Sequence, residues 1–215
     1  MSVTPAQFAI DAATGDPAVR TVTFPGASAV GDLILIFLGI SGGAVTSVID
    51  DLGNWLTKLG DTDIVGTNSH AECWYYLNPV AGTRTITVKI PASSGFATGL
   101  SYSSVDQRQP IGLAVPTTIT ASGSPVSHTI SPVRAGKLVT YGFSTGNATS
   151  ITVTDAGYTV RNATSQYVHC EADIDVPEGS TTTHWSSNGT GTVQWLLWQL
   201  VLQERGVPDK TPWGE

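Results

Sequence analysis

The sequence has few charged residues, and those it has are mostly acidic. Lys, Arg, Asp and Glu together make up 13% of the 215 residues, about half the share of an ordinary soluble protein, and the net charge is −7. No cluster or stripe of Lys and Arg occurs, so the basic surface on which nucleic-acid binding depends is missing. We therefore expect no nucleic-acid partner.

Long apolar runs and a secretion signal are missing as well. The longest fully apolar run is Leu33 to Leu38, far shorter than the roughly 20 residues that cross a membrane as a helix. The opening stretch, MSVTPAQFAIDAATGD, has neither a basic segment nor an apolar one, so it does not read as a signal peptide. We expect a protein that is made in a cytoplasm and has no membrane partner.

Residue patterns that carry known chemistry are also missing. The two cysteines give neither a metal-binding pattern nor a disulfide framework, and the four histidines are scattered, with no H-E-x-x-H motif. The histidines are His70, His128, His169 and His184. We expect no enzyme, no catalytic residue, no metal and no cofactor.

Short segments of alternating apolar and polar residues are abundant. About twelve of them follow one another, with Gly, Pro, Asn or Asp turns every eight to twelve residues, which is typical of antiparallel sandwiches and barrels. No segment keeps a helical period over ten residues. The Leu-rich stretch 193–203 could form a helix, but its counterpart earlier in the chain could not, so we predict a strand. The fold class is all-β.

The chain reads as one β-rich unit written twice. Gly31-Asp32-Leu33 aligns with Gly136-Lys137-Leu138, and the similarity continues downstream on both sides. Three further segment pairs match: 47–55 with 150–158, 70–88 with 166–185, and 95–105 with 191–202. We predict an internally duplicated, jelly-roll-like antiparallel β-sandwich, with a first repeat at 1–106, a connector at 107–123 that could contain one strand near Thr117–Thr120, and a second repeat with a C-terminal tail at 124–215.

The segment 32–40 is apolar on both faces of the strand it predicts. Leu33, Leu35 and Phe37 alternate with Ile34, Ile36, Leu38 and Ile40, so both faces need cover. One face would meet the core of its own sandwich. The other would meet the second half, a loop or another subunit, which leaves packing of the two halves into one body and homo-oligomerisation both open.

Three sets of residues are candidate sites, and each has a structural alternative. Cys73 and Cys170 fall at equivalent positions of the two repeats, where they could form a disulfide, provide a reactive thiol, or be two buried free thiols. Asp51 and Asp155 each precede a glycine by two positions, where they could be calcium ligands or could stabilise a turn through their side chains. Sequons at Asn147, Asn162 and Asn188 read as chance products of an Asn- and Thr-rich surface.

Aromatic side chains offer the best case for a ligand. Trp74 and Tyr76 share one face of a strand, opposite Cys73, Tyr75 and Leu77, and could stack against a sugar ring. Packing between sheets or subunits is the alternative, as it is for Trp185, Trp195 and Trp198. A glycan is therefore a possible partner.

Three motifs carry a resemblance to a known family. GDLILIFLGI, SVIDDLGNW and WYYLNPVAGTRTITV resemble the GDLLV-type strand, SVTDxxGN turn and WYxxNPxAGTxTVTV hairpin of duplicated β-sandwich proteins in tailed bacteriophages and related bacterial surface proteins. The resemblance covers most of residues 20–203, although the second half departs from it where NPVAGT becomes DVPEGS.

The resemblance implies a structural role in a virion. Such phage proteins are commonly capsid decoration or cement proteins, or tail and fibre components. We therefore expect a non-enzymatic capsid decoration protein, whose partners are the major capsid protein or other virion proteins. The alternative is a carbohydrate-binding or receptor-binding module, in a tail fibre or a surface adhesin.

Overall fold

The computed structural model describes residues 3–13, 18–63, 69–90, 94–122, 125–132, 134–145, 150–164, 169–188 and 192–206. These residues form sixteen strands and no helix. The strands of the first half are β1 (Thr4–Ala13), β2 (Val19–Thr23), β3 (Leu33–Ser41), β4 (Ser47–Asp50), β5 (Thr57–Asp63), β6 (Ser69–Leu77), β7 (Thr85–Lys89) and β8 (Ser94–Ser103). Those of the second half are β9 (Ile111–Ser122), β10 (Val126–Ile130), β11 (Gly136–Thr145), β12 (Ile151–Val153), β13 (Thr159–Thr164), β14 (His169–Val176), β15 (Thr181–Ser187) and β16 (Thr192–Leu202).

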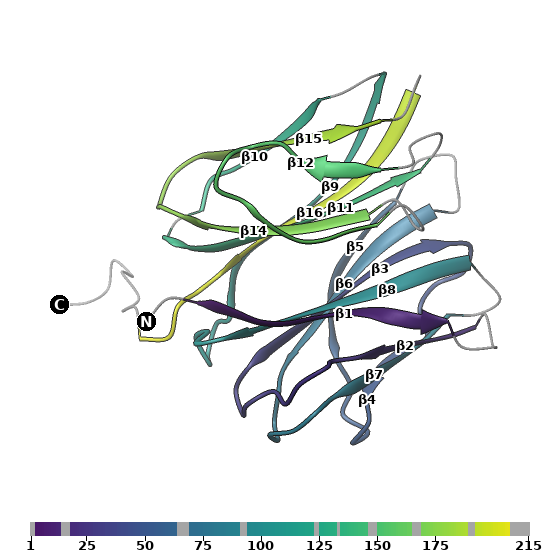
Figure 1. Cartoon of the computed structure of the whole chain (residues 1–215), viewed down its shortest axis with the longest axis vertical. Coiled ribbons are helices and arrows are strands. Elements are labelled where there is room, and N and C mark those ends of the chain that lie inside the picture. The colour runs from purple at the N-terminus through teal and green to yellow at the C-terminus, as the bar shows by residue number, and fades with distance from the viewer. Residues whose placement is uncertain are drawn as a thin grey trace.

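The strands are antiparallel and lie in stacked layers (Figure 1). The first half is one eight-stranded sheet, β4-β7-β2-β1-β8-β3-β6-β5, which curls because the start of β1 pairs with β8 and its end with β2. The second half has a five-stranded sheet, β13-β14-β11-β16-β9, and a three-stranded sheet, β10-β15-β12. Adding eight to each strand number turns the order β1-β8-β3-β6-β5, which is part of the eight-stranded sheet, into β9-β16-β11-β14-β13. We call these two sets of five strands the five-stranded layers.

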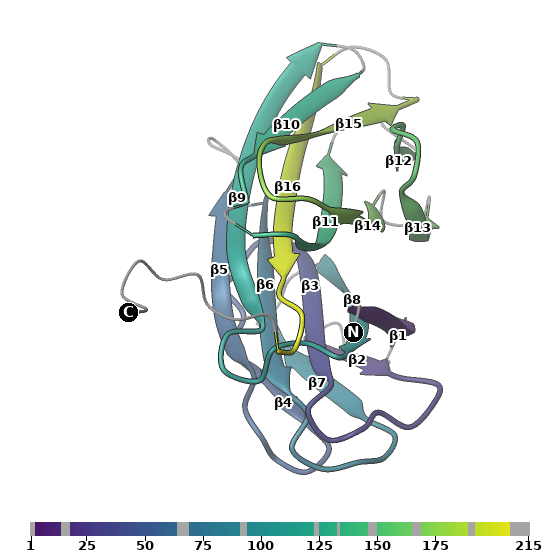
Figure 2. The same cartoon turned by 90° about the vertical axis from the view of Figure 1, so that its left-hand side faces the viewer.

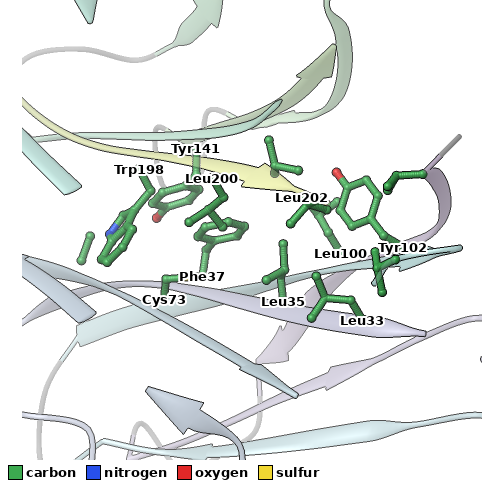
Figure 3. Packing of buried hydrophobic residues seen from close by; sticks show 14 of the residues in the cluster. Leu33, Leu35, Phe37, Cys73, Leu100, Tyr102, Tyr141, Trp198, Leu200 and Leu202 are labelled. Carbon is green, nitrogen blue, oxygen red and sulfur yellow. The ribbon is translucent and has the colours of Figure 1, made fainter. Parts of the chain in front are cut away.

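Strand β3 lies in the middle of the molecule and is covered on both faces. Ile34, Ile36, Leu38 and Ile40 pack against β2, β4 and β7 of the first half. Leu33, Leu35 and Phe37 point the other way, into a cluster that also contains Val139, Tyr141, Trp198 and Leu200 of the second half (Figure 3). The second apolar face of β3 is therefore covered within the chain, and the two halves share a core.

Strand β16 of the second half is likewise covered on both faces. Trp198 enters the cluster shared with the first half, whereas Trp195 enters a cluster with Trp185 and Val126 inside the second half. The two tryptophans therefore lie on opposite faces, as the alternation in VQWLLWQLVL predicts. The prediction of a strand rather than a helix at 193–203 is confirmed by β16.

The segment expected to be a connector is largely a strand. Twelve residues form β9, which pairs with β16 from Thr192 to Leu202 and so belongs to the sheet of the second half. Its proline, Pro116, lies on the edge strand of that sheet, where the missing N–H breaks no hydrogen-bond ladder. The strand expected near Thr117–Thr120 lies within β9, but β9 is much longer than expected, because the Pro, Thr and Ser content of 107–123 is also typical of a loop.

The outer edge of β9 lies beside the outer edge of β5 from the other half (Figure 2). The Thr62 and Thr118 hydroxyl oxygens are 2.9 Å apart, and Thr118 also donates to the Asp63 carbonyl oxygen at 2.9 Å. Strand β5 extends as far as Asp63. The two five-stranded layers are therefore linked along this side.

Candidate functional site

Trp74 and Tyr76, the predicted sugar platform, do share one face of β6. Tyr76 belongs to the apolar cluster of the first half and Trp74 packs against it, while Tyr75 and Leu77 face the shared core. Tyr76 is only 8% exposed, and its hydroxyl donates to Asp50 Oδ2 at 3.3 Å. Burial and the neighbouring Asp50 carboxylate raise the pKa of Tyr76 well above its usual value. The face of Trp74 is therefore the more accessible part of this pair.

Glu72 holds the indole of Trp74 in place. Its carboxylate is 1% exposed and accepts a hydrogen bond from Trp74 Nε1 at 2.7 Å. Lys58 Nζ and His70 Nε2 lie 3.2 and 3.4 Å from Glu72 Oε1. Burial acts to raise the pKa of Glu72, but hydrogen bonds from His70, Trp74 and Lys58 outweigh it and lower the pKa. An aromatic ring beside fixed polar groups is chemically suited to binding a sugar, but these polar groups already form hydrogen bonds and ion pairs with one another.

The candidate calcium residues hold turns together. Asp51 Oδ1 accepts from the Thr85 backbone N–H at 3.4 Å, and Asp155 accepts from the His184 backbone N–H at 2.6 Å. Asp50, which the sequence analysis did not single out, organises its turn more extensively: its Oδ1 accepts from the Leu52 and Asn54 backbone N–H groups. Among the described residues, no group of three or more His, Cys, Asp and Glu side chains could hold a metal ion.

The four histidines lie in four different surroundings. His70 lies beside Glu72, His128 Nε2 is 2.9 Å from Thr117 Oγ1, and His184 Nδ1 is 2.8 Å from Asp155 Oδ1 on a partly exposed surface. His169 is fully buried. The structure therefore brings no two of them into one site.

The cysteines are buried, free and on different sides of their sheets. Cys73 lies in the core shared by the two halves, whereas Cys170 lies in the cluster inside the second half. They were predicted to be equivalent, but on β14 the residue that faces the shared core is Glu171, opposite Tyr141 as Cys73 is opposite Phe37. A shift of one residue in a strand reverses its faces, and the alignment missed that shift.

Glu171 belongs to a buried polar row that the sequence analysis missed. His169, Glu171 and Asp173 alternate along β14 and are 0–2% exposed, although they face the first half. Thr98 Oγ1 donates to Glu171 Oε1 at 2.5 Å, and the Tyr102 hydroxyl donates to Asp173 Oδ2 at 3.1 Å. The available signal was the alternation in HCEADID, in which three ionisable residues occupy one face.

Asp173 is also held by an arginine from the neighbouring strand. Arg161 donates to both carboxylate oxygens, Nε to Oδ2 at 2.5 Å and Nη2 to Oδ1 at 2.9 Å. Lys137 Nζ is 3.8 Å from Asp173 Oδ1 and 2.7 Å from the exposed Asp175. These ionisable groups bind one another across strands, and their arrangement stabilises the contact between the halves.

Exposed apolar side chains gather at one end of the first half. Among the described residues, six large hydrophobic side chains are exposed, and four of them lie on the connections β2–β3, β4–β5 and β6–β7. These four, which we call the loop tip, are Val30 (67% exposed), Leu52 (53%), Trp55 (66%) and Val80 (50%). The three connections lie at the lower end of the molecule in Figures 1 and 2.

Buried polar side chains tie the three connections together. Asn78 donates through Nδ2 to the Ala29 carbonyl oxygen at 3.0 Å and accepts from Arg84 Nε at 3.0 Å. Arg84, only 4% exposed, also donates to the Val80 carbonyl oxygen and has Nη1 4.0 Å from Asp51 Oδ1. The three connections that carry the loop tip are therefore held in place relative to one another by these hydrogen bonds and this ion pair.

No described part of the chain forms a helix that is long and apolar enough to span a membrane. Comparisons with protein-family models, with curated proteins and with solved structures found no match to this chain.

Proposed function

We propose that the chain is a non-enzymatic structural protein of a bacteriophage particle, and specifically a decoration protein that binds the assembled capsid shell. The observation that carries this proposal is the loop tip, where four of the six exposed large hydrophobic side chains gather on three mutually braced connections. Exposed apolar side chains gathered at one end of a protein are typical of a protein-binding surface. The resemblance of the three sequence motifs to phage virion proteins gives the setting.

The fold also supports this proposal, because it is a single rigid body that could attach to a surface. We infer that the chain is a duplicated jelly-roll-like β-sandwich, because the strand order of the first eight strands recurs in the second eight. The two units pack through their five-stranded layers, with Leu35, Phe37, Tyr141 and Trp198 in the common core. The buried ionisable groups hold this body together, which suits a protein that works by attachment.

The test is the composition and location of the protein in purified particles. The polypeptide is expected in gradient-purified virions at a fixed ratio to the major capsid protein, and labelled antibodies are expected to mark the capsid surface in electron micrographs. Virions that lack the polypeptide would overturn the proposal, and labelling confined to the tail would move the protein to a tail or fibre role.

A glycan-binding or receptor-binding module is the second candidate, and Trp74 favours it. Its indole is oriented by Glu72 and flanked by Lys58 and His70, which supplies a stacking face and polar groups. Titration with host surface polysaccharides is expected to change the fluorescence of the wild type and of Trp55→Phe, but not that of Trp74→Phe. A flat response of the wild type across all polysaccharides would rule this candidate out.

A further inference from the structure

Trp55 lies on a turn that is fixed before any partner arrives. Asp50 Oδ1 accepts from Leu52 N at 2.9 Å and Asn54 N at 2.7 Å, while Asp50 Oδ2 accepts from Asn54 Nδ2 at 2.8 Å. Gly53 supplies the positive φ of 85° that closes the turn. The Trp55 backbone then bridges back to Ile49. An exposed indole on a rigid turn loses little conformational entropy on binding, so it is well suited to act as an anchor.

Two corresponding connections of the second half, both within the described residues, lack this feature. The β12–β13 connection carries Ala156 and Tyr158, and the Tyr158 hydroxyl is 2.6 Å from Thr183 Oγ1 instead of being presented to solvent. The β14–β15 connection carries Glu178 where the β6–β7 connection carries Val80. Neither of these two connections, both fully described, has an exposed large hydrophobic side chain. Two of the three connections of the loop tip therefore have counterparts without exposed large hydrophobic side chains.

The chemistry of the loop tip indicates the class of partner. Val30, Leu52 and Val80 are aliphatic and offer no hydrogen bonds to sugar hydroxyls, which argues against a glycan at this end of the molecule. The three connections carry no exposed Lys or Arg, because Arg84 is buried, so an anionic membrane surface is not attracted. Asp51 is the charged neighbour, with a side chain that is 41% exposed.

A second copy of the chain is also a poor occupant. Two loop tips meeting about a twofold axis would bring two Asp51 carboxylates together, and each chain already carries a net charge of −7. A partner with an apolar pocket and a basic rim would instead receive Trp55 in the pocket and Asp51 at the rim. Such complementarity combines an aromatic anchor with electrostatic attraction.

We propose that the loop tip is the attachment surface of the chain, with Trp55 inserting into an apolar, basic-rimmed pocket on a capsid shell protein. This inference rests on the proposed function, because it takes the shell as the partner. It adds the anchor residue, the end of the molecule that binds, and the chemistry of the pocket.

The experiment measures co-sedimentation of the purified chain with shells from which the native protein has been stripped. Trp55→Ser and Val80→Ser are the test variants. Ile10→Ser and Val160→Ser are matched controls, because these side chains are 42% and 43% exposed and lie outside the loop tip. We expect Trp55→Ser to weaken binding at least 10-fold, Val80→Ser to weaken it several-fold, and both controls to stay within about twofold of the wild type.

Two measurements are needed to interpret these variants. The first distinguishes a loss of binding from a loss of folding, and the second distinguishes failure of the inference from failure of the proposed function. Thermal unfolding of Trp55→Ser and Val80→Ser is expected to match that of the controls, because the four residues are all exposed, at 42% to 66%. If the wild type binds shells and Trp55→Ser binds equally well, the inference is wrong and the proposed function stands. If the wild type binds no shell, the proposed function fails, and a dimer that Trp55→Ser abolishes would identify a second copy as the occupant.

Discussion

The rings of Phe37 and Tyr141 stack almost in parallel across the middle of the molecule, with centroids 4.8 Å apart and planes inclined by 8° (Figure 3). Phe37 comes from β3 and Tyr141 from β11, the central strands of the two five-stranded layers. This contact joins the parts of the chain that the sequence presents as repeats. It makes the stability of one half dependent on the presence of the other.

Replacing Phe37 by alanine is expected to destabilise the whole protein. The ring is fully buried, so its removal leaves a cavity and the loss is about 3–5 kcal/mol of unfolding free energy. Urea unfolding followed by far-ultraviolet circular dichroism measures this loss. Val160→Ala, at a 43% exposed position, is the control and is expected to change stability by less than about 0.5 kcal/mol. A loss below about 1 kcal/mol for Phe37→Ala would show that the stack is not structurally important.

The two thiols are expected to become reactive together. Burial raises the pKa of Cys73 well above the usual thiol value and that of Cys170 to about 12, so neither forms the reactive thiolate in the folded protein. Cys73 reports on the core shared by the halves and Cys170 on the interior of the second half. Because one core joins the halves, both should label with a thiol reagent at the same urea midpoint, as read by mass spectrometry of Cys73→Ser and Cys170→Ser. Labelling of Cys73 at a clearly lower urea concentration would mean that the halves separate before they unfold.

Strands could be predicted from the sequence where apolar and polar residues alternate strongly. In the strands that are apolar on both faces, the face on which each side chain lies could be predicted as well. The opposite placement of Trp195 and Trp198 on β16 followed directly from the period of two residues. Strand β9 was predicted only near Thr117–Thr120, because a proline and several threonines occur both in loops and at sheet edges. The difference between these two segments lies in their tertiary neighbours, which the local pattern does not contain.

The candidate sites were less predictable, because their character depends on burial. Trp74 and Tyr76 were correctly placed on one face, but the cover over Tyr76 comes from strands distant in the sequence. Glu171 and Asp173 read as surface residues, yet they are enclosed by Thr98 and Tyr102, more than 70 residues away. Trp55 was passed over because an aromatic residue beside a turn is equally compatible with exposure and with packing.

Removing Arg161 is expected to leave the Asp173 carboxylate poorly compensated. The Asp173 side chain is 2% exposed and Arg161 holds both of its oxygens, while Arg161 itself is 27% exposed. Arg161→Met should therefore reduce the unfolding free energy by about 2–3 kcal/mol, towards the lower end for a broken buried pair. Asp61→Asn is the control, because its pair with Lys58 is solvated and should contribute less than about 1 kcal/mol. Equal effects of the two substitutions in denaturant titrations would contradict a structural role for the Arg161–Asp173 pair.

Acid is expected to weaken the contact between the halves through His169. The ring stacks on Phe96 with centroids 4.3 Å apart, is fully buried, and has a pKa that burial lowers from 6.5 to about 3. Between these values the unfolded chain binds a proton that the folded protein does not, so the unfolding free energy falls as the pH drops from about 6.5 towards 3. One such group contributes a slope of at most about 1.4 kcal/mol per pH unit.

The pH interval below 6.5 can be used to test the contribution of His169 itself, by comparing the wild type with a variant that lacks this imidazole. His169→Gln is expected to lose stability less steeply than the wild type between pH 6.5 and 4 in urea titrations. Glu171 Oε1 lies 3.5 Å from His169 Nε2 and would attract an imidazolium, but the enclosed ring loses the hydration that the charged form needs. A wild type that gains stability relative to His169→Gln as the pH falls would show that this attraction prevails over burial, and the prediction would be wrong.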